Sequence, residues 1–97
     1  MNKTAILSYA LRHPDKPCPV RGFGVALQDL THDGYELFGL LISRKEFNAD
    51  RYTEEQRVAI ALWLQDTLLP QLNQYALVKL SVIDEGLNDH EGSAGFE

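Results

Sequence analysis

The chain has 97 residues, of which 44% are hydrophobic and 24% charged, and its formal net charge is −5. This length and composition predict one folded domain around a single core, and they exclude an intrinsically disordered chain. No run of about eighteen uncharged apolar residues occurs, and the start of the chain lacks the pattern of a secretory signal, so we expect a cytoplasmic protein that does not use a membrane.

The first predicted element, Thr4 to Leu11, fits two patterns. Its apolar residues alternate as they do in a strand, while Leu7, Ala10 and Leu11 also have helical spacing. We adopt the strand and keep the helix as the alternative. A proline-rich connection, Asp15 to Val20, follows it.

A β-hairpin is predicted next. Two β-like runs, Arg21 to Leu30 and Tyr35 to Ser43, flank an Asp33-Gly34 pair. Glycine accepts the positive φ that a tight hairpin turn requires, which makes Asp-Gly between apolar runs a strong turn signal. The residues expected to face the core are Phe23, Val25 and Leu27 on the first strand and Phe38, Leu40 and Ile42 on the second.

The clearest local signal is the start of a helix at Thr53. Thr53 and Gln56 have the spacing of a capping box, in which each side chain bonds the backbone amide of the other residue. Glu54 and Glu55 fall in the first helical turn, where their charge complements the positive end of the helix dipole. We therefore expect a firmly anchored helix with an acidic start.

The body of this helix is expected to bury a wide apolar face. Trp63 falls on the opposite flank, toward the side of Tyr52, where we expect it to be half-exposed. It is then either a lid over the edge of the core or an anchor in an interface. Pro70 lacks an amide hydrogen and clashes with the preceding turn, which predicts a kink or an end near Leu69. The residues assigned to the main buried face are Val58, Ala61, Leu62, Leu68, Leu69 and Leu72.

The last predicted strand is Tyr75 to Ile83, which is rich in β-forming residues and is expected to bury one face fully. The order β-β-β-α-β, with the first element uncertain, predicts an α+β fold: a small antiparallel β-sheet with one long amphipathic helix packed on one face. Residues 1–86 form this single α+β domain, and residues 87–97 are expected to be a flexible acidic C-terminal tail.

Signatures of catalysis, cofactor binding and metal binding are missing. His13, His32 and His90 do not have the spacing of metal ligands, and Gly22–Gly24 is only a fragment of a nucleotide-binding motif. Cys18 is the only cysteine, which excludes an internal disulfide and a zinc site built on paired thiolates. We therefore predict no catalytic residue, no cofactor and no metal, and we interpret Cys18 as a loop residue.

These observations favour a non-enzymatic protein-binding module, with an inhibitor of the immunity or anti-defence type as the leading form. Acidic residues gather in the second half of the chain. Solubility is the commoner reason for surface acids, and the alternative that we adopt for function is a partner protein with a basic surface. Two acidic pairs and two aromatic residues are the predicted contacts, because steering charges beside aromatic side chains are typical of interfaces. They are Tyr52, Glu54, Glu55, Trp63, Asp84 and Glu85.

Two alternative functions stay open. One is a nucleic-acid accessory protein that uses a basic patch at Arg12, Lys16 and Arg21, although the net charge makes nucleic acid an unfavoured partner. Another is a small ligand-binding domain or enzyme whose site is assembled by the fold. The lining residues considered for it are Tyr9, His13, Cys18 and His32. Homo-oligomerisation through an open sheet edge is compatible with each of these functions.

Overall fold

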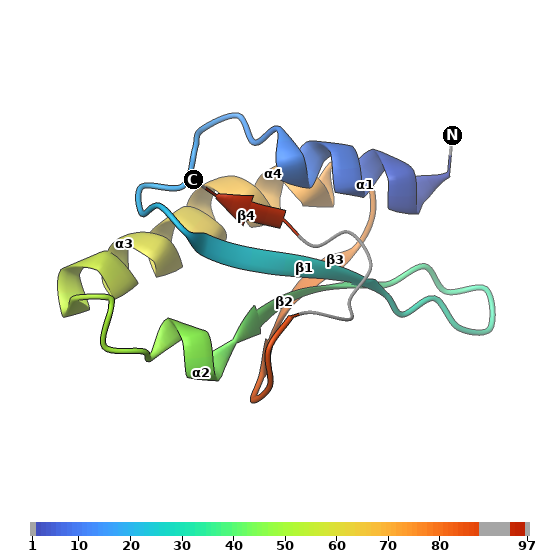
Figure 1. Ribbon diagram of the computed structural model, residues 1–97. Coiled ribbons are helices and arrows are strands. Elements are labelled where there is room, and N and C mark those ends of the chain that lie inside the picture. The colour runs from blue at the N-terminus through green and yellow to red at the C-terminus, as the bar shows by residue number, and fades with distance from the viewer. Residues whose placement is uncertain (1, 88–93, 97) are drawn as a thin grey trace.

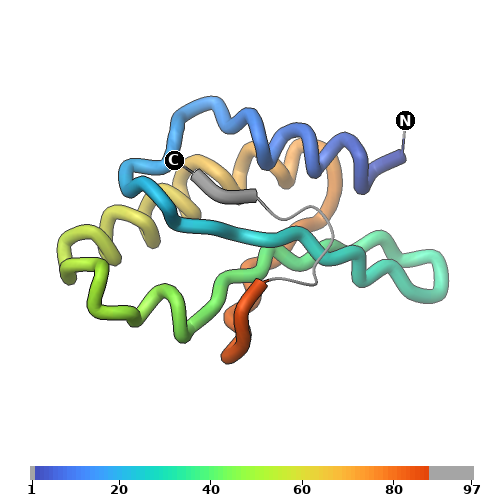
Figure 2. The backbone as a smooth tube through the Cα atoms, in the orientation of Figure 1, coloured from blue at the N-terminus to red at the C-terminus, as the bar shows by residue number. Residues whose placement is uncertain are grey.

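The computed structural model describes residues 2–87 and the backbone of residues 94–96. The predicted α+β class is confirmed: one four-stranded sheet is covered by helices on one face (Figures 1 and 2). In chain order the elements are α1 (Lys3–Arg12), β1 (Phe23–Asp29), β2 (Phe38–Ser43), α2 (Arg44–Phe47), α3 (Glu54–Trp63), the π-helical segment η1 (Leu64–Leu68), α4 (Leu69–Asn73), β3 (Val78–Ile83) and β4 (Ala94–Phe96). No helix within the described ranges is long and apolar enough to cross a bilayer.

The hairpin prediction is confirmed. Strands β1 and β2 pair antiparallel, and the ladder continues to a bridge between His32 and Tyr35. Asp33 and Gly34 form the turn with φ of 50° and 83°, the two positive values that this tight connection needs. The alternate residues predicted to face the core on both strands are all buried in one cluster.

The N-terminal element is a helix, so the strand prediction for Thr4 to Leu11 is wrong. Asn2 caps α1, because its Oδ1 accepts a hydrogen bond from the Ala5 amide at 2.8 Å. Leu7 and Leu11 then lie on one face of α1 and are fully buried. The cap, together with this four-residue spacing, outweighs the alternation that suggested a strand.

The long helix does not end near Leu69. It continues from α3 through η1 and α4 to Asn73, and the Leu69 amide bonds the Leu64 carbonyl across a wide π turn. Pro70 thereby comes to lie in the first turn of α4, where a missing amide hydrogen is tolerated. The π segment therefore lets the chain carry a proline without breaking the helix.

The orientation of this helix also differs from the prediction. Val58 and Leu62 are each 53% exposed, whereas Trp63 is only 6% exposed and belongs to the core with Ile60. The loop between α1 and β1 covers the Trp63 flank, and the indole Nε1 donates to the Lys16 carbonyl at 2.9 Å. Spacing along one helix cannot show this contact, which comes from a segment 47 residues away in sequence.

The sheet is mixed, so the prediction of an antiparallel sheet is wrong at one pairing. Strand order is β3-β2-β1-β4, with β1 antiparallel to β2 and β4 but β2 parallel to β3. The helices between β2 and β3 form the crossover that a parallel pair requires. The expected fully buried face of β3 is also wrong, because Leu80 and Val82 are exposed on this edge strand.

The core has two parts. The larger cluster fills the space between the helices and the sheet, and Leu7, Phe23, Leu40, Trp63 and Leu68 belong to it. A smaller cluster of Ala26, Leu41 and Leu87 lies apart from it. The flexibility expected for residues 87–97 stays a prediction, since residues 88–93 and 97 lie outside the described residues, although Leu87 is buried and β4 pairs with β1.

Candidate functional site

The first turn of α3 presents two acidic side chains from a rigid backbone. The predicted capping box is present: the Gln56 amide donates to Thr53 Oγ1 at 3.1 Å, and the Thr53 amide donates to Gln56 Oε1 at 2.8 Å. Glu54 and Glu55 follow the cap, and both are exposed. The local sequence thus fixes the backbone under these two carboxylates before any partner arrives.

The nearest arginines do not neutralise this acidic turn. Glu54 and Arg57 have a spacing that allows an ion pair on a helix. The Arg57 Nη1 atom instead donates to the Tyr52 carbonyl at 2.9 Å, and the Arg51 guanidinium lies 4.9 Å from the centre of the Tyr52 ring. Within the described residues, neither Glu54 nor Glu55 forms a salt bridge.

The two aromatic residues predicted as contacts lie in the core. Tyr52 is 5% exposed, and its ring meets Phe23 edge to face at 6.2 Å between centroids. Its hydroxyl has no hydrogen-bond partner among the residues that the structure describes. Trp63 is enclosed by the loop before β1, so the expectation that Tyr52 and Trp63 lie on an exposed flank is wrong.

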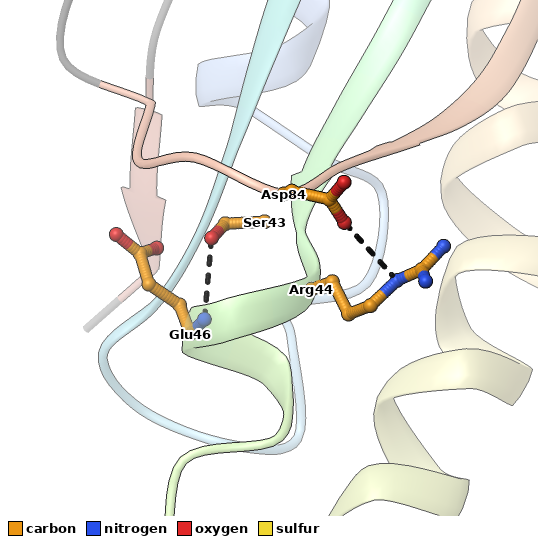
Figure 3. A network of polar contacts seen from close by, with 4 residues as sticks. All are labelled: Ser43, Arg44, Glu46 and Asp84. Atoms are coloured by element: carbon orange, nitrogen blue, oxygen red, sulfur yellow. Dashed lines mark hydrogen bonds and ion pairs between the residues drawn. The ribbon is translucent and has the colours of Figure 1, made fainter.

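The second acidic pair, Asp84 and Glu85, directly follows β3. Asp84 Oδ1 lies 3.6 Å from Arg44 Nε, at the start of α2 (Figure 3), and both side chains of this ion pair are mostly exposed. The Ser43 hydroxyl accepts from the Glu46 amide at 3.2 Å and caps α2 beside this pair. A solvent-exposed ion pair of this kind contributes at most about 1 kcal/mol, so Asp84 is only partly compensated. Glu85 is exposed as well, without a salt bridge in the described ranges.

The residues of the nucleic-acid alternative are all on the surface. Arg12 lies in the last turn of α1, and Lys16 and Arg21 lie in the loop that leads to β1. Their side chains are exposed, while the Lys16 carbonyl is held by Trp63.

A surface cavity of about 400 Å³ lies beside α1 and α4. Tyr9 and His13, two residues considered for a ligand site, line it together with Tyr75, whereas Cys18 and His32 are not among its lining residues. The Tyr9 and His13 rings are in contact, 4.3 Å apart between centroids and tilted by 45°. The fold therefore assembles part of the predicted ligand-site set.

Gln71 of α4 lines this cavity and bonds the end of α1 and the loop that follows it. It is 8% exposed, and its Oε1 accepts from the Asp15 amide at 2.8 Å while its Nε2 donates to the Ala10 and His13 carbonyls at 3.5 and 3.4 Å. Gln71 was not among the residues predicted from the sequence, because its role depends on contacts with the end of α1 and the loop that follows it.

The Cys18 thiol is expected to be unreactive. Partial burial raises the pKa of this thiol, and a hydrogen bond with the Val20 backbone lowers it by less. A raised pKa means less thiolate at neutral pH, and the thiolate is the nucleophile. We predict that Cys18 of the folded protein reacts with Ellman's reagent at pH 8 several times more slowly than Cys18 of the denatured chain. Equal or faster labelling of the folded protein would contradict this.

Metal-ligating side chains do not gather in the described part of the chain, where no three His, Cys, Asp or Glu residues could hold an ion together. His90 lies outside the described residues.

Comparison with known proteins gives no match: no family model fits the chain, and no curated protein or solved structure is significantly similar to it.

Proposed function

We propose that this protein is a small, acidic, non-enzymatic binding module that docks through the first turn of α3 onto a protein with a basic surface. The observation that carries the proposal is the uncompensated charge of Glu54 and Glu55, which are exposed and unpaired among the described residues. By occupying a basic site of its partner, such a module would act as an inhibitor, of the immunity or anti-defence type.

The positive end of the α3 dipole does not cancel the negative charge of Glu54 and Glu55. A helix N-terminus carries the equivalent of about half a positive charge, which two carboxylates exceed. A net negative turn attracts a basic surface during encounter and raises the association rate. Because the capping box holds the turn in place, little conformational freedom is lost on binding.

The other predicted contacts take different parts in this proposal. Asp84 and Glu85 add negative potential beyond the end of β3, with Asp84 partly balanced by Arg44. Tyr52 and Trp63 are buried, so they position α3 from inside the core and do not touch the partner in this conformation.

Affinity capture with charge-neutral variants tests the proposal. Glu54→Gln/Glu55→Gln is expected to lose a protein that the tagged wild type captures and that mass spectrometry identifies. The matched control Asp33→Asn/Glu36→Gln removes two charges from the exposed hairpin tip and is expected to retain that protein. Melting temperatures of both variants are measured alongside, because loss of favourable dipole interactions costs about 0.3–1 kcal/mol per carboxylate. Equal capture by both variants, or no specific protein with the wild type, would refute the proposal.

A further inference from the structure

One side of the β3 backbone faces no other strand among those that the structure describes. β3 is last in the strand order and pairs with β2 alone among the described strands. The Phe38 amide donates to the Leu77 carbonyl at 2.9 Å, so the backbone groups of Leu77 point toward β2. These directions alternate along a strand, and the N–H and C=O groups of Val78, Leu80 and Val82 therefore point outward.

The first outward position is already occupied by a side chain. The Val78 amide donates to Asn73 Oδ1 at 3.0 Å, and Asn73 Nδ2 donates to the Val78 carbonyl at 3.2 Å. The Asn73 amide thus replaces a neighbouring strand at this residue. In the described structure the outward groups of Leu80 and Val82 have no comparable partner. The open part of the edge is therefore these two residues.

Their side chains are apolar and accessible. Leu80 is 41% exposed and Val82 is 48% exposed, although they share the face of β3 on which Val78 is buried. Natural edge strands usually discourage pairing with charges, prolines or bulges, and β3 has only Lys79 for this purpose. Exposed apolar side chains beside open backbone groups favour pairing with another strand.

We propose that β3 pairs antiparallel with β3 of a second copy of this chain, about a twofold axis at Ser81. Leu80 of each copy then lies opposite Val82 of the other. All the open backbone groups at these two positions gain partners, and the apolar side chains pack in cross-strand pairs. This dimer goes beyond the proposed function and does not depend on it, since it leaves the first turn of α3 free.

The hydrogen bonds of Asn73 restrict where the twofold axis can lie. An axis nearer the start of the strand would need the backbone groups of Val78, which Asn73 already bonds. An axis at Val82 would set Leu80 opposite a residue beyond the end of β3. Only the axis at Ser81 uses both open residues within the strand.

The charges at the two ends of the strand favour the same antiparallel arrangement. Lys79 stands near the start of β3, and Asp84 and Glu85 follow its end. In the proposed register Lys79 lies opposite Ile83 of the second copy, the last residue of β3, directly after which the acidic residues Asp84 and Glu85 follow. The symmetry makes this pairing twice. Parallel pairing of the same strands would instead place like charges side by side.

Solution mass tests whether the dimer forms through this edge. Light scattering from micromolar to submillimolar concentration is expected to show wild-type mass rising toward twice the monomer value. Leu80→Lys/Val82→Lys is expected to stay monomeric. Val58→Lys/Leu62→Lys is the control, because it places the same two charges on apolar residues of α3 that are each 53% exposed, and it should still dimerise. A wild type that is monomeric throughout, or dimerisation that Val58→Lys/Leu62→Lys also abolishes, overturns the proposal.

Cysteine cross-linking tests the register. The axis places Ser81 opposite its own copy at a position without mutual hydrogen bonds, where Cα atoms are about 4.5 Å apart and a disulfide can form. In a Cys18→Ala background, Ser81→Cys is expected to cross-link under mild oxidation. Lys79→Cys should not, because its two copies are about 13 Å apart along the strands. Equal or faster cross-linking of Lys79→Cys overturns the register.

The charge variants separate this proposal from the proposed function. Glu54→Gln/Glu55→Gln should dimerise like the wild type even if it no longer captures a partner, because its changes lie away from the β3 edge. Loss of the dimer in that variant would show that the two surfaces are not independent and would count against the β3 interface.

Discussion

Trp63→Ala is expected to lower the free energy of unfolding by about 3–5 kcal/mol, the range for removing a large buried aromatic side chain. The indole is 6% exposed in the core, and it is the group that holds the loop before β1 against α3 through the Lys16 carbonyl. Its loss leaves a cavity and removes that hydrogen bond. Urea denaturation followed by far-UV circular dichroism measures the change, which is large against a typical total of about 5–15 kcal/mol.

Two further variants test whether the stability loss of Trp63→Ala comes from the burial of the Trp63 side chain. Trp63→Phe keeps most of the packing and should cost clearly less than alanine. Leu62→Ala removes an apolar side chain from the neighbouring exposed position and should change stability by less than about 1 kcal/mol. A loss below about 1 kcal/mol for Trp63→Ala would mean that Trp63 is exposed, as its helical position alone suggests.

Phe23→Ala is expected to cost a similar amount, about 3–5 kcal/mol. Phe23 is 1% exposed, and its ring meets Phe47 of α2 and Tyr52 edge to face, at 5.9 and 6.2 Å between centroids. Such ring pairs add to the effect of area burial. Removing the ring opens the contact between β1 and the segment that leads into α3, which the same urea denaturation detects.

Near-UV circular dichroism distinguishes a local loss of packing around Tyr52 in Phe23→Ala from unfolding of the whole domain. The tyrosine signal should weaken at temperatures where the far-UV signal still reports a folded chain, because Tyr52 loses one of its packing partners. Phe23→Leu fills most of the volume and should restore much of the stability. If Phe23→Ala unfolds with wild-type stability, the ring is not a central part of the core.

Two local signals, a turn and a helix cap, predict local structure well, whereas the local alternation at Thr4 to Leu11 does not. The Asp33-Gly34 turn and the Thr53 capping box each depend on residues within four positions of one another, and both are present as expected. The acidic start of α3 was predicted for the same reason, because exposure in the first turn after a cap needs no distant contact.

Structure that depends on distant contacts was predicted less well. Trp63 is buried by a loop far away in sequence, which helical spacing does not describe. The parallel pairing of β3 with β2 follows from a helical crossover between them, and the predicted strand-helix-strand order already allowed it. The role of Asn73 at the strand edge becomes visible only when α4 and β3 are placed side by side.

The central claim is that an uncompensated acidic turn on α3 binds a basic protein surface. Its most direct test is the affinity for the captured partner between about 0.1 and about 1 M salt, over which the Debye length falls from about 10 Å to about 3 Å. We predict that the wild type binds at least about tenfold more weakly at the high end and that Glu54→Gln/Glu55→Gln depends less on salt. An affinity that does not change with salt, or an equal salt dependence in both proteins, would contradict the claim.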